Sequence, residues 1–213
     1  MQIRKILLFF VLVFSWLFAV ADITIKNGID YTVINNQSAS KPQKTLHIME
    51  FFAFTCYHCQ QLEKRLEDFV GKNKNIKLEK IHAVWNDSND IKNLAKLNAT
   101  ITITGLKFLY LPIFDAIMKG QNLNDETILK TFLLKNKLTE KQTTWFLQVY
   151  NSFAVDVAVG KYKQLTKMYN ITGTPMIIIA DKYLIAPATP QRTIEVLSQL
   201  VLEVKTKKQS KNE

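Results

Sequence analysis

A dense apolar run from Leu46 to Phe54 leads directly into a segment with helical spacing, and both cysteines of the chain lie at this junction. The run is short enough for a buried strand. From Tyr57 to Val70, apolar residues recur on one side of a helix, and Gly71 is expected to end it. The opposite, polar side of this helix comprises Glu63, Lys64, Glu67 and Asp68. The junction therefore predicts a strand that carries two cysteines to the start of a helix.

The spacing of the two cysteines, Cys56 and Cys59, favours a redox pair over a structural bridge or a metal site. Two thiols cannot complete a four-thiolate zinc site, and His58 lies between them, where it cannot easily join the same tetrahedron. A bridge across two residues closes almost no loop and so adds little stability. We therefore expect no metal, and we expect a disulfide that forms and breaks during function.

The start of the helix also assigns roles to the two sulfurs. Free backbone N–H groups and the positive end of the helix dipole stabilise an anion there, so a thiol at that position ionises at lower pH. This predicts Cys56 as the exposed, reactive sulfur and Cys59 as the shielded, resolving one. A protonated His58 would stabilise the Cys56 thiolate further, and a disulfide whose reduced form is stabilised is a strong oxidant.

The first 21 residues read as an export signal. Arg4 and Lys5 form a basic start, Ile6 to Phe18 supply an apolar stretch, and Ala19-Val20-Ala21 matches the A-x-A cleavage pattern. An uncleaved membrane anchor is the alternative, but an apolar run of about 15 residues is short for a span of about 20. The sequence therefore predicts cleavage after Ala21 and a mature protein in an oxidising space, the periplasm.

The mature chain predicts an α/β protein with an inserted all-helical domain. Strand patterns are expected at Ile23–Ile25, Tyr31–Ile34, Leu46–Phe54, Ile76–Trp85, Pro175–Ala180 and Tyr183–Ile185, with a linker over 35–44. Helices are expected at Asp90–Leu97, Thr102–Met118 with Pro112 kinking or breaking it, Asp125–Leu134, from Glu140 onward, in a long segment ending near Tyr169, and at Thr189–Val204. The run Thr100–Thr104 has strand propensity. We expect the α/β part to comprise 22–85 and 152–204, the insertion 86–151 and a disordered tail 205–213.

The formal net charge of +10 does not indicate a nucleic-acid partner. Of the 28 cationic side chains 25 are lysines, whereas proteins that grip phosphates or read bases usually enrich arginine. The lysines are spread along the chain, as on a solvated surface, and Arg4 and Lys5 belong to the export signal. We therefore expect no nucleic-acid binding.

Two charged residues lie on apolar faces of the predicted strands. Glu50 shares a face with Ile48 and Phe52, and Lys80 shares a face with Ile76 and Leu78. If the two strands are neighbours, Glu50 and Lys80 pair and neither charge is buried alone. A desolvated Glu50 could then accept or supply the proton of Cys59. The alternative is an exposed Lys80 and a Glu50 that contacts water at a strand end. His47 and His82 are expected to be structural or surface residues.

The stretch Glu50-Phe51-Phe52-Ala53-Phe54-Thr55-Cys56-Tyr57-His58-Cys59 resembles the active-site strand and helix of the DsbA family of exported thiol:disulfide oxidoreductases. Further matches follow in order: Gly28 with Tyr31-Thr32, Lys80 to Val84, Leu111-Pro112-Ile113-Phe114, Asn151-Ser152-Phe153 and Gly173-Thr174-Pro175. The resemblance covers nearly all of the mature chain. It implies a thioredoxin fold with an inserted helical domain, and it supports the pairing of Glu50 with Lys80.

The resemblance also implies further site residues. Pro175 would be a cis-proline that faces the disulfide and presents the Thr174 backbone to an extended substrate, although a plain strand-starting proline is the alternative. Tyr57 and Thr174 stand where many DsbA proteins have proline and valine. Both positions affect redox poise, so the strength of oxidation stays open.

The partners implied by the resemblance are folding exported proteins with free thiols and a membrane DsbB-type protein that reoxidises the dithiol. No cofactor is implied beyond the Cys56–Cys59 disulfide, and a monomer is expected. Two alternatives remain: a disulfide reductase or isomerase of the same fold, and a noncatalytic chaperone that holds its substrates.

Overall fold

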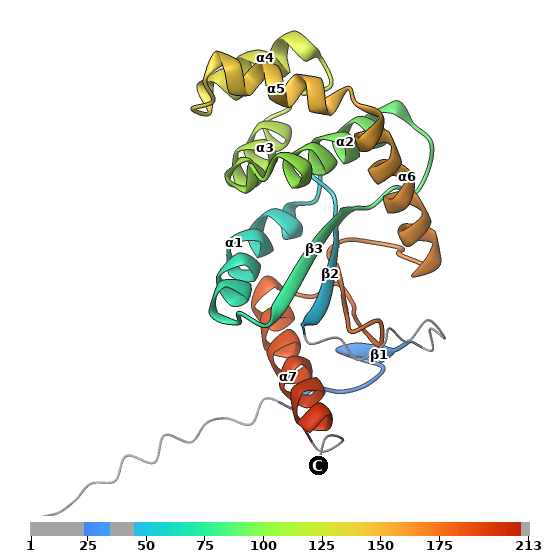
Figure 1. Cartoon of the computed structure of the whole chain (residues 1–213). Coiled ribbons are helices and arrows are strands. Elements are labelled where there is room, and N and C mark those ends of the chain that lie inside the picture. Colours follow the sequence, from blue (N-terminus) through green and yellow to red (C-terminus); the bar gives the residue numbers. More distant parts are fainter. Residues whose placement is uncertain (1–23, 35–44, 210–213) are drawn as a thin grey trace, which may run out of the picture.

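The computed structural model describes residues 24–34 and 45–209 (Figure 1). The predicted export signal and the predicted linker over 35–44 lie outside the described residues, as does Ile23 of the first predicted strand. Thr24 and Ile25 are described and belong to no strand, so that strand prediction is wrong. Within the described part of the chain, none of the helices combines the length and apolar composition that a bilayer span needs.

A five-stranded mixed sheet forms the centre of the molecule, with the strand order β1-β5-β4-β2-β3. Strands β2 and β3 are parallel, and the neighbouring pairs β2–β4, β4–β5 and β5–β1 are antiparallel. The strands are β1 (Tyr31–Val33), β2 (Leu46–Phe52), β3 (Ile76–His82), β4 (Met176–Ile179) and β5 (Tyr183–Ile185). Strand β2 therefore has a partner on each side, and its carboxyl end holds the start of the cysteine segment in a fixed place.

Helices cover both faces of this sheet, and successive residues of β2 alternate between them. Ile48 packs in a core with α1 and α7, whereas Met49 and Phe51 pack in a core with α2 and α6 (Figure 1). These helices are α1 (Tyr57–Lys72), α2 (Asn89–Thr104), α6 (Phe153–Met168) and α7 (Pro190–Gln209). Since side chains alternate along a strand, Glu50 points to the same side as Ile48, toward α1.

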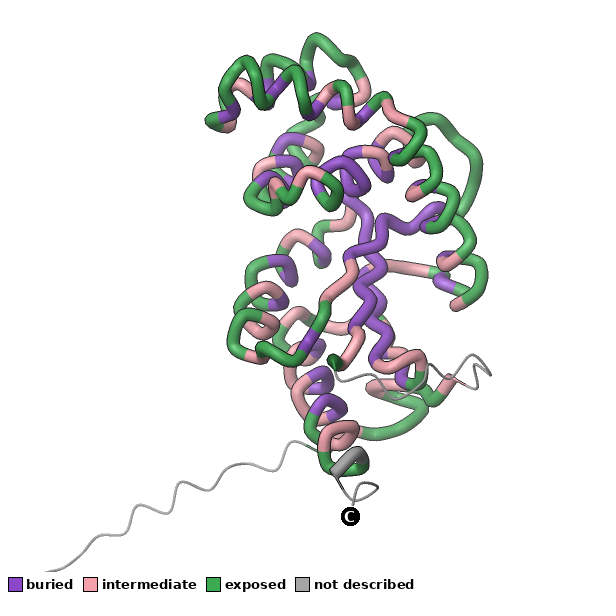
Figure 2. The backbone as a smooth tube through the Cα atoms, viewed as in Figure 1, coloured by how far each residue is buried: buried purple, intermediate pink, exposed green. Residues whose placement is uncertain are grey.

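A second helical layer lies beyond the carboxyl ends of β2 and β3. It comprises α2 together with a short 3-10 helix (Lys107–Leu109), α3 (Tyr110–Met118), α4 (Glu126–Lys135) and α5 (Glu140–Tyr150). Phe52 and Phe54, at and just after the end of β2, belong to the same buried cluster as Leu97, Ile101 and Phe114 of these helices. Figure 2 shows buried backbone running from the centre of the sheet into this layer. The segment that carries the cysteines is thus packed between the sheet and this layer.

Two predicted helix ends and one predicted strand end are wrong. Helix α1 continues past Gly71 to Lys72, because Gly71 is not in the left-handed conformation of a helix end and Asn73 caps the helix, its N–H donating to the Val70 carbonyl (2.9 Å). Helix α7 extends to Gln209, so the predicted tail begins too early. Strand β3 ends at His82, three residues before Trp85.

The region from 97 to 118 also differs from the prediction. Thr100–Thr104 is the last part of helix α2, which Ser88 caps at the start and Gly105 ends with a left-handed backbone (φ 72°). Tertiary packing of Ile101 overrides the strand propensity of this run. Pro112 lies in the first turn of α3, where a missing N–H breaks no helical hydrogen bond, so the break comes at Gly105 instead.

Candidate active site

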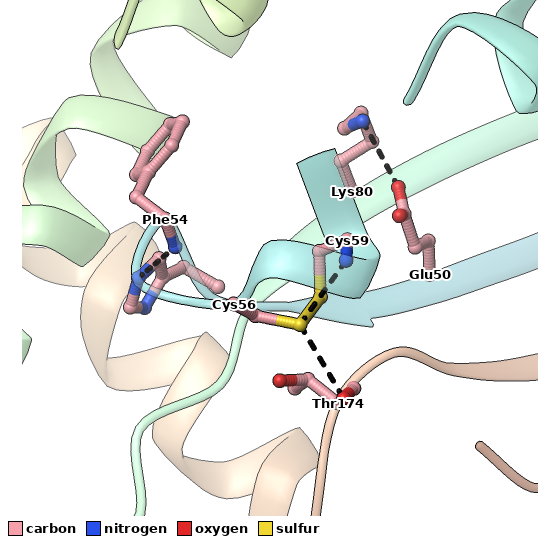
Figure 3. The surroundings of a disulfide bond; sticks show 7 residues. Glu50, Phe54, Cys56, Cys59, Lys80 and Thr174 are labelled. Carbon is pink, nitrogen blue, oxygen red and sulfur yellow. Dashed lines mark hydrogen bonds and ion pairs between the residues drawn. A yellow bond between two sulfur atoms is a disulfide. The ribbon is translucent and has the colours of Figure 1, made fainter. Parts of the chain in front are cut away.

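Cys56 and Cys59 form a disulfide across the first turn of α1 (Figure 3). Cys56 is the N-cap residue of the helix, with an extended backbone, and its sulfur accepts a hydrogen bond from the Cys59 N–H (3.1 Å). Cys59 is fully buried, whereas Cys56 is partly exposed. A nucleophile from outside can therefore reach the sulfur of Cys56 and not that of Cys59.

The loop before β4 faces the disulfide. The Thr174–Pro175 peptide bond is cis, as the family resemblance implied, and the Sγ of Cys56 lies 3.4 Å from the Thr174 carbonyl oxygen (Figure 3). Pro175 has no N–H, so the Thr174 carbonyl is the backbone group of this bond that can contact a bound chain. The two halves of the site thus come from segments about 118 positions apart in the sequence.

Tyr57 and His58 occupy the first turn of α1 directly after Cys56, and both are exposed. Their rings lie edge to face, with 5.8 Å between the centroids. An imidazole at this position shares the N-terminus of the helix with the Cys56 sulfur. A positive charge on it would favour an anionic sulfur.

The ion pair expected between the two strand charges is present. The Lys80 Nζ lies 3.0 Å from a carboxylate oxygen of Glu50, and the two side chains are 6% and 0% exposed. Parallel pairing of β2 and β3 places Glu50 and Lys80 in register, so both point to the α1 side. The alternative of an exposed Lys80 and a hydrated Glu50 is therefore wrong.

The structure adds a third charged group, Glu63, which the sequence analysis placed on the polar side of the helix. Glu63 is buried and forms an ion pair with Lys80. It lies four residues after Cys59, one helical turn further along α1, and so on the same face as Cys59. That spacing from a buried cysteine is the signal in the sequence that could have identified Glu63.

Burial and mutual attraction shift the pKa values of two of these groups, Glu63 and Lys80. Burial, helped by the nearby Glu50 carboxylate, raises the pKa of Glu63 to about 7, although Lys80 opposes this shift. Burial alone would lower the pKa of Lys80, but the carboxylates of Glu50 and Glu63 outweigh it and hold that pKa above its ordinary value. Lys80 is thus a permanent cation, and Glu63 can gain or lose a proton at physiological pH.

Two residues of the helical layer complete the surroundings of Lys80. The Tyr110 ring lies under the ammonium, 4.4 Å from the Nζ, and the Tyr110 hydroxyl donates to the side-chain oxygen of Asn98 (2.7 Å). The Asn98 amide in turn donates to the Lys80 carbonyl (2.8 Å). The sequence analysis identified neither residue, because only the tertiary arrangement brings α2 and α3 against β3.

A metal site was not expected from the sequence. In the chain from 24 to 34 and from 45 to 209, no three side chains of histidine, cysteine, aspartate or glutamate come together as metal ligands. The site comprises the disulfide, His58 and the Glu50–Lys80–Glu63 cluster.

Comparison with known proteins gives a consistent result. The family model of the DSBA-like thioredoxin domain matches residues 47–198. The Thiol:disulfide interchange protein DsbA of Burkholderia cepacia is 31% identical over 189 residues, which cover 85% of this chain and 87% of that protein. Its counterpart in Pseudomonas syringae pv. tomato is 26% identical over 183 residues and 83% of each chain.

Solved structures agree with these relatives. The oxidoreductase NmDsbA1 from N. meningitidis is 25% identical, with a TM-score of 0.73 over 86% of this chain and 96% of that one. The crystal structure of Pseudomonas aeruginosa DsbA, at 20% identity, has a TM-score of 0.74 over 84% and 94% of the two chains, and so shares the fold. The fold class predicted from the sequence, an α/β thioredoxin fold with inserted helices, is confirmed.

Proposed function

Because the chain belongs to the DSBA-like thioredoxin domain family and is a thiol:disulfide oxidoreductase, we propose that it donates its Cys56–Cys59 disulfide to exported proteins that carry free thiols. It works in the periplasm, after removal of the signal behind Ala21. The observation that carries this proposal is the partly exposed Cys56 sulfur at the N-cap of α1, which already accepts a backbone hydrogen bond.

The exchange proceeds in two balanced steps. A substrate thiolate attacks the Sγ of Cys56, the Cys56–Cys59 bond breaks, and the bonding electrons leave with the Cys59 sulfur, which takes up a proton. A second substrate thiolate then attacks the substrate sulfur of this mixed disulfide and expels Cys56 as a thiolate. Two electrons have passed from the substrate to the protein. The helix N-terminus and the Cys59 N–H favour the expelled anion and so favour oxidation of the substrate.

The loop at Thr174 and Pro175 receives the substrate as an extended chain. The Thr174 carbonyl lies beside the reactive sulfur, and Tyr57 is exposed on the adjoining turn of α1. Recognition through backbone contacts suits many unrelated substrates, as a general oxidant requires. A membrane DsbB-type protein reoxidises the dithiol, the protein acts as a monomer, and no cofactor takes part beyond the disulfide itself.

The direction of the reaction can be tested by equilibrium with glutathione. We expect the equilibrium to favour the reduced protein. We also expect the Cys56 thiolate, measured by its absorbance, to form at a pH well below the ordinary pKa of a cysteine thiol. His58→Leu removes a ring that can carry a positive charge beside that thiolate. We expect it to shift the equilibrium about tenfold toward the disulfide, since one pKa unit corresponds to a factor of ten. His47→Leu, a histidine change at the far end of β2, serves as the control.

A near-ordinary Cys56 titration together with a strongly reducing equilibrium would contradict the oxidant role. The protein would then be a reductase or isomerase of the same fold. If His58→Leu and His47→Leu behave alike, His58 has no part in stabilising the thiolate.

Glu50 is the group that we propose to exchange a proton with Cys59. Figure 3 shows Glu50 and Lys80 on the Cys59 side of the disulfide, with the Glu50 carboxylate directed at Lys80. Lys80 also pairs with Glu63, which lies one turn from Cys59 on α1. Neither oxygen of Glu50 accepts a hydrogen bond within the described part of the chain, although Lys80 balances its charge. Glu50 can therefore take a proton without breaking such a bond.

Glu50→Gln should slow the steps in which Cys59 gains or loses its proton by about tenfold or more, because positioned proton transfer commonly contributes at least that factor. The titration of Cys56 should change little. Stopped-flow measurement of reduction and reoxidation at several pH values resolves the two effects. Glu79→Gln is the matched control, since Glu79 lies on β3 beside Lys80 and is paired with His47 and Lys161 instead. Equal rates in Glu50→Gln and the wild type would remove Glu50 from the mechanism.

A further inference from the structure

His82 is the last residue of β3 and is 2% exposed. It is in register with Phe52 of β2, and its ring lies against the rings of Phe52 and Phe54, with centroids 5.5 and 5.7 Å apart. From the sequence, His82 was expected to be only a structural or surface residue. A polar ring buried among aromatic side chains costs free energy unless its nitrogens find partners.

Both ring nitrogens of His82 have partners, and the partners determine the tautomer. The Phe54 backbone N–H donates to Nε2 (3.2 Å), which must therefore carry a lone pair. The Nδ1 lies 3.1 Å from the Ala83 carbonyl oxygen, an acceptor, so Nδ1 carries the proton and donates it. Burial lowers the pKa of His82 to about 4, in agreement with a neutral ring at physiological pH.

The hydrogen bond from Phe54 supports the turn that leads to the reactive cysteine. The Cys56 N–H donates to the Ala53 carbonyl (2.9 Å), which closes the turn, and the Ala83 N–H donates to the Phe52 carbonyl just before it (2.8 Å). The Phe54 N–H lies inside this turn, on a fully buried residue, where a donor without an acceptor is costly. The His82 ring supplies that acceptor from the neighbouring strand.

We propose that His82 is a positioning residue for Cys56 and favours the reduced, thiolate form of the site. In the oxidised protein the bond to Cys59 holds the Cys56 sulfur at the helix N-terminus in addition to the turn. In the reduced protein that bond is absent, and the turn has a larger share in keeping the sulfur in line with the Cys59 N–H. Loss of the His82 contact therefore weakens the reduced state more than the oxidised state. The inference rests on the proposed role of Cys56 as the exchanging sulfur.

The test compares His82→Leu, which fills the space without an acceptor, with His82→Gln, whose side-chain oxygen can accept from Phe54. Thr166→Val is the matched control, because the Thr166 hydroxyl also accepts a buried backbone N–H, that of Val84 (3.1 Å). Thiolate absorbance and glutathione equilibrium are measured for each reduced protein. We expect His82→Leu to raise the pKa of the Cys56 thiol by about one unit and to shift the equilibrium about tenfold toward the disulfide. His82→Gln should restore most of both values, and Thr166→Val should lower the melting temperature alone.

If His82→Leu and Thr166→Val lose stability alike and leave the thiolate titration and the equilibrium unchanged, His82 is structural only and the proposal is overturned. If His82→Leu does not fold, a measurement on the wild-type protein can still overturn the proposed role of His82. Nitrogen chemical shifts of the wild-type His82 ring must show the proton on Nδ1 in both redox states, and a proton on Nε2 would contradict the proposal. Failure of the proposed function is a separate result, because it would appear as a wild-type protein whose Cys56 does not exchange with glutathione.

Discussion

Cys56→Ala reduces thiol:disulfide exchange to the uncatalysed background while the protein stays folded. The reason is that Cys56 carries the only sulfur of the pair that is open to solvent, so a substrate thiolate has no other atom of the disulfide to attack. The measurement is the rate at which a reduced, unfolded substrate regains its disulfides in the presence of the oxidised protein or the variant. Circular dichroism shows whether the fold is kept.

Cys59→Ala is the control that separates the roles of the two sulfurs. It keeps the nucleophile at the helix N-terminus but removes the buried partner. We expect it to accumulate a mixed disulfide with substrate, which non-reducing electrophoresis detects. If Cys56→Ala instead protects substrates as well as the wild type does, the protein acts as a noncatalytic chaperone.

Lys80→Met lowers the free energy of unfolding by about 3–5 kcal/mol at pH 7, because it leaves two carboxyl groups buried without a cation. Lys92→Met provides the matched control. Lys92 lies 3.0 Å from Asp87, but the two side chains are 40% and 63% exposed, and surface pairs contribute about 0–1 kcal/mol. Urea unfolding of both variants measures the difference.

The loss in Lys80→Met should depend on pH. Burial raises the pKa of Glu63 to about 7 even though Lys80 opposes this shift, so removal of Lys80 raises that pKa further. The folded variant then holds a proton that the unfolded chain, with an ordinary carboxyl pKa of 4.5, has already released. Stability therefore falls as pH rises above 4.5 in both proteins, because Glu63 keeps its proton in each folded state. Above about pH 7 the wild type releases this proton, whereas the variant keeps it and continues to lose stability. The deficit of the variant relative to the wild type is therefore larger at pH 8 than at pH 5. A deficit that is equal at both pH values, or no larger than that of Lys92→Met, contradicts the proposed burial of the three charges.

The parts of the site that lie within one strand or one turn could be predicted from the sequence. The apolar run before Cys56 indicated a buried strand, and the helical spacing after it placed Cys56 at a helix start, where the structure has it as the N-cap. The two-residue period of the strands put Glu50 and Lys80 on buried faces. Their pairing then needed only that the two strands be neighbours.

The remaining members of the site depend on which elements cover which faces, and sequence pattern does not contain that information. The sequence pattern assigns Glu63 to the polar side of an amphipathic helix, and only the packing of α1 against β3 shows that it is buried beside Lys80. Tyr110 and Asn98 reach Lys80 only because α2 and α3 pack beyond the ends of the strands. His82 gains its partners from the turn that follows a different strand. Tertiary packing also explains the helix at Thr100–Thr104: Ile101 is buried in the helical core, and this packing outweighs the strand propensity of the run.

The strand order has a consequence for how the chain becomes functional during synthesis. The cysteines lie at the start of α1, directly after β2, but β4, the neighbour of β2 on one side, comes after α6. A nascent chain that has not yet reached Thr174 can form the helix with both sulfurs but lacks the carbonyl that faces them and one partner of β2. Such late, long-range pairing is slow compared with helix formation. The loop at Thr174, to which we assign substrate binding, is therefore made late, and an unfinished chain carries both cysteines before this loop can contact them.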